Sequence, residues 1–187
     1  LKETLVSNLD YLLATPLAFL ESPQSANYRK NNAGYGHWGD WRHQNWGIEY
    51  RTPASWLASE KLTLQVLTLA YAIADATLKK APLPLLSHLP DLRNAFNYHN
   101  LNDLANYLNP LKQQTKTLPL YHNEIYQKII KGFWLDVNQH AQPFLTEIQW
   151  GWHLPLEFTK LLQTQSLVEV CQKLVKYLTL FSSSLAL

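Results

Sequence analysis

The first twenty residues have the hydrophobic spacing of a helix. The apolar positions that share one face of this helix are Leu5, Leu9, Leu12 and Leu13. Pro16 lacks an N–H donor, and its ring clashes with the preceding turn. The pattern therefore predicts a helix over residues 1–20, with an interruption at Thr15 and Pro16.

A glycine-rich aromatic stretch comes next, and its pattern changes near its end. Residues 28–46 lack a helical period, which predicts a loop with extended segments. Residues 47–52 then alternate in a β-rich run that Pro53 ends. In a strand, Ile48 and Tyr50 share one face and Glu49 and Arg51 share the other. We expect the first pair to be buried and the second pair to lie on a concave polar face.

The rest of the chain has helical spacing. Ser59 is a suitable N-cap for a long helix that reaches about Lys80. This helix is apolar on nearly all sides, so we expect it to be central and buried. Further helices are predicted at about residues 90–98, 101–108, 122–138, 156–163 and 166–181. The fold class expected is α+β, in which a short antiparallel strand contribution joins a dominant helical layer.

Composition bounds the class of protein. A chain of 187 residues with 47% hydrophobic residues can bury a core as one domain or as one lobe of a larger one. A net charge of +2, without blocks of like charge, argues against nucleic acid and membrane-surface partners. The most apolar run, 62–78, is short for a membrane span. Cys171 is the single cysteine, and we expect it to be a buried thiol in the last helix.

Several kinds of site are not indicated by the sequence. The seven histidines lack metal-ligand spacing, and neither a Walker phosphate loop nor a Gly-x-Ser-x-Gly elbow is present. A cluster of four tryptophans has two interpretations, as a stacking platform for sugars or bases or as a wedge against the core. The four are Trp38, Trp41, Trp46 and Trp56.

Three arginines and a glutamate are the candidates for chemistry. A surface ion pair would explain Glu49 and Arg51 alone. It would not explain the flanking glycines or the nearby Asp40 and Arg42. Arginine binds phosphate oxygens in a bidentate manner, and a carboxylate on the same face can hold Mg²⁺. Such a strand is suited to binding a polyphosphate during phosphoryl transfer.

Three segments in order resemble the carboxylate–amine ligases, the superfamily of glutamine synthetase and glutamate–cysteine ligase. The first is "LDYLLATPLAFLE" together with the "YRK" that follows it, the second is "YGHWGDWR", and the third is "GIEYRTPASWL". The second contains Tyr-Gly-x-x-Gly-x-x-Arg, which precedes a Glu-Tyr-Arg strand in the amidoligase branch of phages and bacteria. The resemblance covers roughly residues 8–75, and it implies a glutamine-synthetase-like catalytic fold. We therefore expect a single lobe over 1–187 with a motif region over 8–75 and a helical region over 76–187.

The resemblance also implies roles for individual residues. Glu49 matches a carboxylate that binds an active-site divalent ion, and Arg51 matches an arginine that reaches the nucleotide phosphate. Arg42 matches an arginine expected to contact phosphate or the substrate carboxylate, so Arg42 and Arg51 are the candidate catalytic residues. Arg29 matches the first of a pair of basic residues that bind the nucleotide, whose second member here is Lys30 rather than arginine.

The activity implied is ATP-dependent formation of an amide or peptide bond through an acyl phosphate, with Mg²⁺ and with carboxylate and amine substrates that are small molecules or proteins. Family members carry further metal-binding acids in a Glu-x-Glu strand, which this sequence lacks, and the chain does not begin with methionine. We therefore expect the C-terminal part of a larger ligase, completed by a missing N-terminal half, a companion chain or an oligomeric assembly. We expect the chain alone to be inactive, and to be cytoplasmic or part of a phage or virion assembly.

Two other functions stay open at this stage. One is an aromatic-rich glycan-binding module, which would present exposed coplanar indole rings. The other is a structural or virion-associated protein derived from a ligase that has lost its activity.

Overall fold

The computed structural model describes residues 1–54, 56, 57, 59–81 and 89–139. The chain divides into two units, Leu1–Gly151 and Trp152–Leu187, and the described residues belong to the first. The helices expected at 156–163 and 166–181, and the thiol of Cys171, lie outside the described residues. The single lobe over 1–187 stays a prediction.

The N-terminal helical segment runs to Leu20 without the interruption expected at Pro16. It consists of α1 (Lys2–Leu9), the π-helix η1 (Asp10–Ala14), α2 (Thr15–Leu17) and the 3₁₀-helix η2 (Ala18–Leu20). In the π turn the N–H of Thr15 bonds to the carbonyl of Asp10, and so does the Thr15 hydroxyl, at 2.8 Å. The wider turn just before Pro16 accommodates the proline, because it moves the preceding carbonyls out of the α-helical positions with which the ring would clash.

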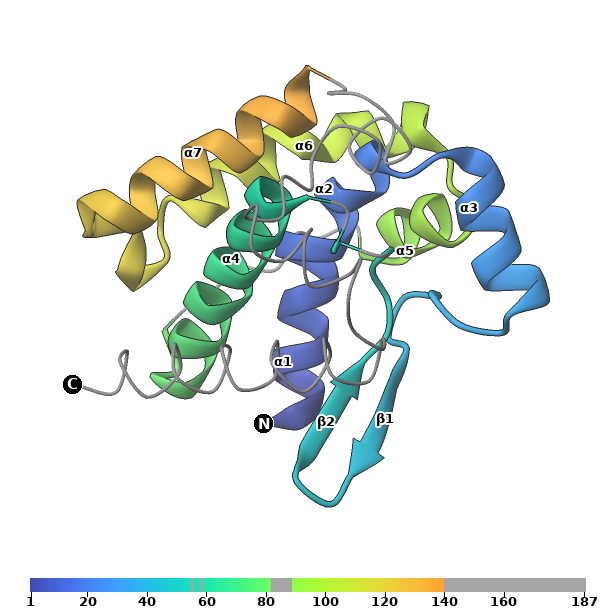
Figure 1. The fold of residues 1–187 in the computed structure, drawn as a ribbon, viewed down its shortest axis with the longest axis horizontal. Helices are drawn as coiled ribbons and strands as arrows, with labels where there is room; N and C mark the ends of the chain where they lie inside the picture. Colours follow the sequence, from blue (N-terminus) through green and yellow to red (C-terminus); the bar gives the residue numbers. More distant parts are fainter. Residues whose placement is uncertain (55, 58, 82–88, 140–187) are drawn as a thin grey trace, which may run out of the picture. The chain divides into compact units, whose positions relative to one another are not determined.

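Two short helical pieces and a hairpin come next in the chain. After α3 (Pro23–Asn27), residues Tyr28–Asn32 form a second π-helix, η3, where the sequence predicted a loop. Strands β1 (Trp41–Gln44) and β2 (Gly47–Tyr50) form an antiparallel hairpin (Figure 1). The expected strand at 47–52 is confirmed for four residues. The Arg51 N–H extends the pairing by one more bond, to the Asp40 carbonyl at 2.9 Å.

Helices form the remainder of the described chain. They are α4 (Glu60–Leu78), α5 (Leu89–Asn97), α6 (Leu101–Thr115), the 3₁₀-helix η4 (Pro119–His122) and α7 (Glu124–Asn138) (Figure 1). Ser59 caps α4 as predicted, since its hydroxyl accepts a hydrogen bond from the Leu62 N–H at 3.1 Å. The described part of the chain is thus mostly helical with one short antiparallel sheet. No helix within it is long and apolar enough to cross a membrane.

The core forms where these helices meet η1. Helix α4 packs against α1, η1 and α7, and α6 packs against both α5 and η1. The largest fully buried side chains include Tyr11, Leu12, Leu69, Ile73, Leu104, Phe133 and Trp134. Helix α4 is central, as expected, but it is buried on one side only, because Leu64, Leu67 and Tyr71 are half exposed or more.

Candidate functional site

The hairpin has one charged face and one face that packs inward. Arg42 lies directly opposite Glu49, and Trp41 lies opposite Tyr50. Because alternate residues of a strand share a face, the outward-facing residues on the two sides of the ladder are Asp40, Arg42, Glu49 and Arg51. We call these four residues the charged face. On the opposite face Tyr50 packs against the core, but Ile48 and Tyr50 are both only partly buried, so the expectation that both are buried is wrong.

Arg51 is held in place on the charged face. Its guanidinium lies 3.8 Å from Asp40 Oδ1 and 3.6 Å from Glu49 Oε1, which are ion-pair distances rather than hydrogen bonds. Its Cζ lies 5.1 Å from the centre of the Tyr35 ring, within the range of a cation–π contact. The side chain is 16% exposed, whereas that of Glu49 is 43% exposed and also accepts a hydrogen bond from Gln44 at 2.8 Å.

Arg42 is in the opposite situation. It is exposed, and its side chain makes no hydrogen bond or ion pair with the residues that the structure describes. Its planar fork of donors can therefore take a carboxylate or a phosphate without first breaking a contact. Arg42 lies directly across the ladder from Glu49, so both predicted residues are on the same small surface.

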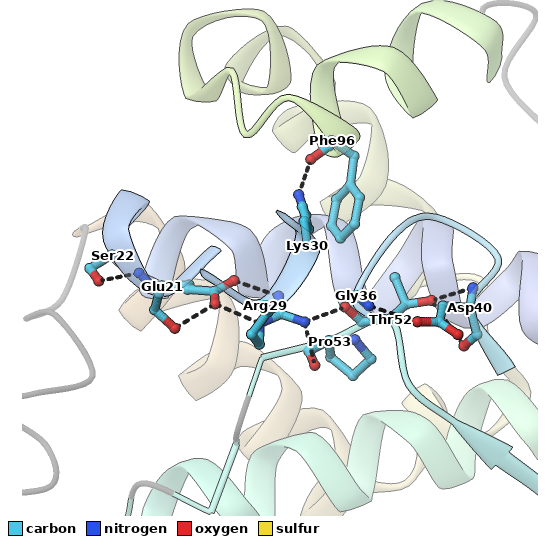
Figure 2. A network of polar contacts seen from close by, with 10 residues as sticks. Glu21, Ser22, Arg29, Lys30, Gly36, Asp40, Thr52, Pro53 and Phe96 are labelled. Atoms are coloured by element: carbon cyan, nitrogen blue, oxygen red, sulfur yellow. Dashed lines mark hydrogen bonds and ion pairs between the residues drawn. The ribbon is translucent and has the colours of Figure 1, made fainter. Parts of the chain in front are cut away.

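Arg29 is buried, and its guanidinium is bound to other groups of the protein (Figure 2). Its Nε and Nη2 donate to the two carboxylate oxygens of Glu21 at 2.8 and 2.7 Å. Its Nη1 donates to the carbonyls of Thr52 and Pro53 at 3.2 and 3.3 Å. Every nitrogen of the guanidinium therefore has a partner, and the role of Arg29 shown here is to fasten the end of the hairpin. Nucleotide binding by Arg29 stays a prediction.

Gly36 makes room for the Arg29 side chain. Its φ of +96° is a conformation that favours glycine, and a Cβ at this position would lie 2.0 Å from Arg29 Nη1. The Gly36 N–H donates to Asp40 Oδ2 at 2.7 Å (Figure 2). The glycine of the Tyr-Gly-x-x-Gly-x-x-Arg segment thus links the buried arginine to the charged face.

Asp10 ties the inward face of the hairpin to the core. The Tyr50 hydroxyl donates to Asp10 Oδ1 at 2.6 Å, across 40 positions of sequence. Burial raises the pKa of Asp10 to about 6, although the Tyr50 hydroxyl, the nearby Thr52 hydroxyl and the Gly39 backbone act to lower it. Burial and the Asp10 charge likewise raise the pKa of Tyr50.

The described residues do not form a complete metal site. They contain no group of three His, Cys, Asp or Glu side chains that could hold a metal ion. Glu49 offers carboxylate oxygens, the ligand type that Mg²⁺ prefers, but it supplies only one such side chain. The charged face is better suited to binding the phosphates of ATP than to binding a metal ion. Exposed Arg42 and partly exposed Arg51 both lie on it and can donate hydrogen bonds to phosphate oxygens.

The structure thus brings three of the four predicted site residues together, namely Arg42, Glu49 and Arg51. Arg29 does not lie on that face but is linked to it by Tyr35, whose ring lies 5.5 Å from the Arg29 Cζ and 5.1 Å from that of Arg51. Both Glu49 and Arg51 lie outside the cleft that is lined by Lys30 and His99.

Sequence reasoning assigned no role to Asp10, Glu21, Tyr35 or Gly36. A signal was present, since Asp10 and Glu21 are the two acids within the otherwise apolar segment "LDYLLATPLAFLE". Acids in such a run are rarely buried without partners. That rule points to a polar partner for each of them, which the hairpin and η3 supply.

The tryptophans do not form a platform of exposed rings. Trp38 contacts Phe96 edge-on, with ring centres 5.8 Å apart, and Trp56 is packed against the core. Trp46, in the hairpin turn, is 77% exposed. This arrangement favours the wedge interpretation over a glycan-stacking surface.

Comparison with known proteins agrees with the resemblance seen in the sequence. No curated protein and no solved structure matches the chain. The sequence profile of one family matches residues 1–147, which include the whole motif region and helices α1 to α7. Its description is "Phage phiEco32-like COOH.NH2 ligase-type 2". The chain therefore belongs to the phage phiEco32-like family of carboxylate–amine ligases, type 2.

Proposed function

We propose that this protein takes part in the ATP-dependent joining of a carboxylate to an amine. A carboxylate oxygen attacks the γ-phosphorus of ATP, which breaks the bond to the β-phosphate and releases ADP. The amine then attacks the carbonyl carbon of the acyl phosphate, inorganic phosphate leaves with the bonding electrons, and the nitrogen loses a proton. The product is an amide or peptide bond.

The observation that carries this proposal is the charged face of the hairpin, considered together with family membership. Arg42 has free donors, Arg51 is fixed by Tyr35 and two carboxylates, and both share a surface with Glu49. Arginine side chains can stabilise the charge that develops on a transferred phosphoryl group, Arg51 as a donor already fixed in place and Arg42 through donors that are free to turn to the phosphate. We assign Arg42 and Arg51 to that role.

The proposal includes a source of further acidic residues. Mg²⁺ would screen the phosphate charge, and Glu49 by itself does not meet its coordination. In our proposal a further segment or a companion polypeptide supplies the other acids and completes a glutamine-synthetase-like fold. The 187-residue chain by itself would then be inactive. The substrates are small-molecule or protein carboxylates and amines.

The test is ADP release from ATP in the presence of mixed carboxylates and amines, measured for the 187-residue chain and for the chain co-expressed with its companion. We expect turnover only in the second case. Arg42→Ala should lower kcat/KM about a hundredfold, the usual effect of losing one positioned donor. Lys128→Ala removes one positive charge from an exposed position of α7 and serves as the control.

Equal turnover by Arg42→Ala and the Lys128→Ala control would overturn the assignment of Arg42. If the chain alone released ADP as fast as the co-expressed preparation, the proposal that a companion polypeptide supplies the missing acids would be wrong. A complete absence of ADP release in the co-expressed preparation, with both proteins folded, would favour a family member that has lost its activity.

A further inference from the structure

A cleft of about 460 Å³ lies beside η3, and its lining includes Lys30 but not Arg29. It is formed by α3, η3, the loop at His37 and the C-terminal end of α5. Its polar lining consists of Lys30, His37, His99 and four asparagines, Asn27, Asn31, Asn94 and Asn97. This volume suits a ligand of amino-acid to dipeptide size.

The lining carries a positive charge and no carboxylate. Lys30 is 7% exposed, and its ammonium donates to the Phe96 carbonyl and lies 4.5 Å from the Phe96 ring centre (Figure 2). The nearest acid that acts on it is Glu21, which is bound to Arg29. An ammonium has three donors, so a buried Lys30 with one hydrogen bond is under-satisfied.

His99 is the second under-satisfied group. Both of its ring nitrogens are buried, and neither meets the geometry of a hydrogen bond with the described residues, although the backbone of Glu21 lies close enough to the ring to act on its pKa. Its backbone has φ of +52°, at the end of α5, where glycine or asparagine is the usual residue. A bulky side chain at this position costs conformational energy.

We infer that this cleft binds a small ligand through an anionic group, a carboxylate or a phosphate. Lys30 supplies the positive charge, His99 supplies a ring N–H, and the asparagines hydrogen-bond the rest of the ligand. Burial and the neighbouring Arg29 lower the pKa of Lys30 to about 8, while Glu21 raises it, so the ammonium is still mostly charged at pH 7.

In the proposed ligase the group held here is the carboxylate of a substrate, and that identification rests on the proposed function. Binding of the anion does not rest on it. If ATP turnover fails and the cleft still binds an anion, the proposed function falls and the binding site stands. The reverse result would remove the site and leave the ligase assignment intact.

The experiment is a titration of the 187-residue protein with glutarate and, separately, with inorganic phosphate at constant ionic strength and pH 7. Histidine ring resonances are followed by NMR, and that of His99 is assigned from a His99→Gln variant. We expect the His99 signal to shift and saturate at roughly millimolar ligand. The signals of His43 and His122, which lie outside the cleft, should stay constant.

Variants separate a specific site from a general charge effect. Lys30→Met should weaken binding at least tenfold, whereas Lys128→Met, which removes an exposed charge on α7, should not. Because Lys30 is buried, its replacement could also impair folding. Asn94→Asp is a milder change at an exposed position of the lining, and its added negative charge should weaken binding about fivefold or more. Asn102→Asp, the same change outside the cleft, is its control.

Saturation with glutarate alone would identify a carboxylate ligand, and saturation with phosphate would identify a phosphorylated one. Either result supports the site if Asn94→Asp weakens binding and Asn102→Asp does not. The inference is wrong if neither probe shifts the His99 signal at a concentration 20-fold above the expected, roughly millimolar dissociation constant. It is also wrong if Asn94→Asp and Asn102→Asp bind the probes equally well.

Discussion

Glu21 and Arg29 form a buried, bidentate ion pair in which both carboxylate oxygens accept hydrogen bonds from the guanidinium. The pair joins the end of the first helical segment to η3, and its remaining nitrogen reaches the backbone after β2. The Arg29 guanidinium is therefore one of the contacts that fix the charged face to the helical core, beside the hydrogen bond from Tyr50 to Asp10.

Replacing Glu21 by glutamine should destabilise the protein strongly. The change removes the negative charge while Arg29 remains buried, and breaking a buried pair in this way typically costs about 3–5 kcal/mol. The loss is measured by urea unfolding at pH 7. Lys79→Met breaks the exposed pair between Lys79 and Asp75 and should cost less than about 0.5 kcal/mol. Similar losses of unfolding free energy in the two variants would show that the buried pair contributes no more to stability than the exposed one.

Gly36→Ala should be much more harmful than Gly39→Ala. Both glycines have positive φ, so both variants carry the backbone cost of about 1 kcal/mol. Only the Cβ at Gly36 meets Arg29 Nη1, at 2.0 Å, whereas a Cβ at Gly39 meets nothing within 4 Å. The difference in melting temperature between the two variants therefore measures how firmly Arg29 is held. Equal melting temperatures would contradict the packing seen around Arg29.

Asp10 should make the protein less stable as the pH rises from 5 to 7.5. Its pKa is raised from 3.8 to about 6 on folding, so the folded state holds more protons than the unfolded state between those values. The stabilisation from proton binding is complete below the unfolded pKa and is lost as the pH rises through the folded pKa. The expected loss from this group is about 1 kcal/mol over that interval.

The Asp10→Asn variant isolates this contribution from other titrations. Asparagine keeps an oxygen that can accept from the Tyr50 hydroxyl but does not titrate. His99 works in the opposite direction, because burial and Lys30 lower its pKa and its protonation disfavours the folded state. The test is the difference between wild type and variant in unfolding free energy at pH 5 and 7.5, and an unchanged difference would contradict the raised pKa.

Glu49→Gln and Arg51→Lys should reduce ATP turnover in the complemented ligase and leave stability nearly unchanged. The first removes a carboxylate charge, and the second keeps a positive charge but loses the planar fork. We expect roughly a hundredfold loss in rate for each. Since the ion pair between them is partly exposed and 3.6 Å long, the free energy of unfolding should change by at most about 1 kcal/mol in each variant. Wild-type turnover by both would make the charged face a purely structural surface.

The sequence predicted those elements whose signals are local. The cap at Ser59 and the extent of α4 can be read from adjacent residues, as can the alternation that places Glu49 and Arg51 on one side of a strand. The segment order that indicated the ligase family is also confirmed by the family match over residues 1–147.

The features that the sequence missed depend on contacts between distant residues. Helix α6 continues through Pro110 because Leu104 and Leu111, on either side of it, are both fully buried, and this packing outweighs the local cost of proline. The partnership of Tyr50 with Asp10 spans 40 residues, so spacing does not reveal it. The burial of Arg29 could not be read from its position in a polar stretch, because its partner Glu21 belongs to a different segment.

The π-helix η3 limits how the length of this chain can change during evolution. A π turn holds one residue more than an α turn, and here it lets the neighbours Arg29 and Lys30 both be buried while serving different partners. Deleting one residue from Tyr28–Asn32 would rotate the preceding helix by about 100° relative to the chain that continues from η3. The ion pair with Glu21 and the contact with Phe96 could then not both be kept. Insertions and deletions should therefore accumulate in the exposed hairpin turn around Trp46 and spare this one helical turn.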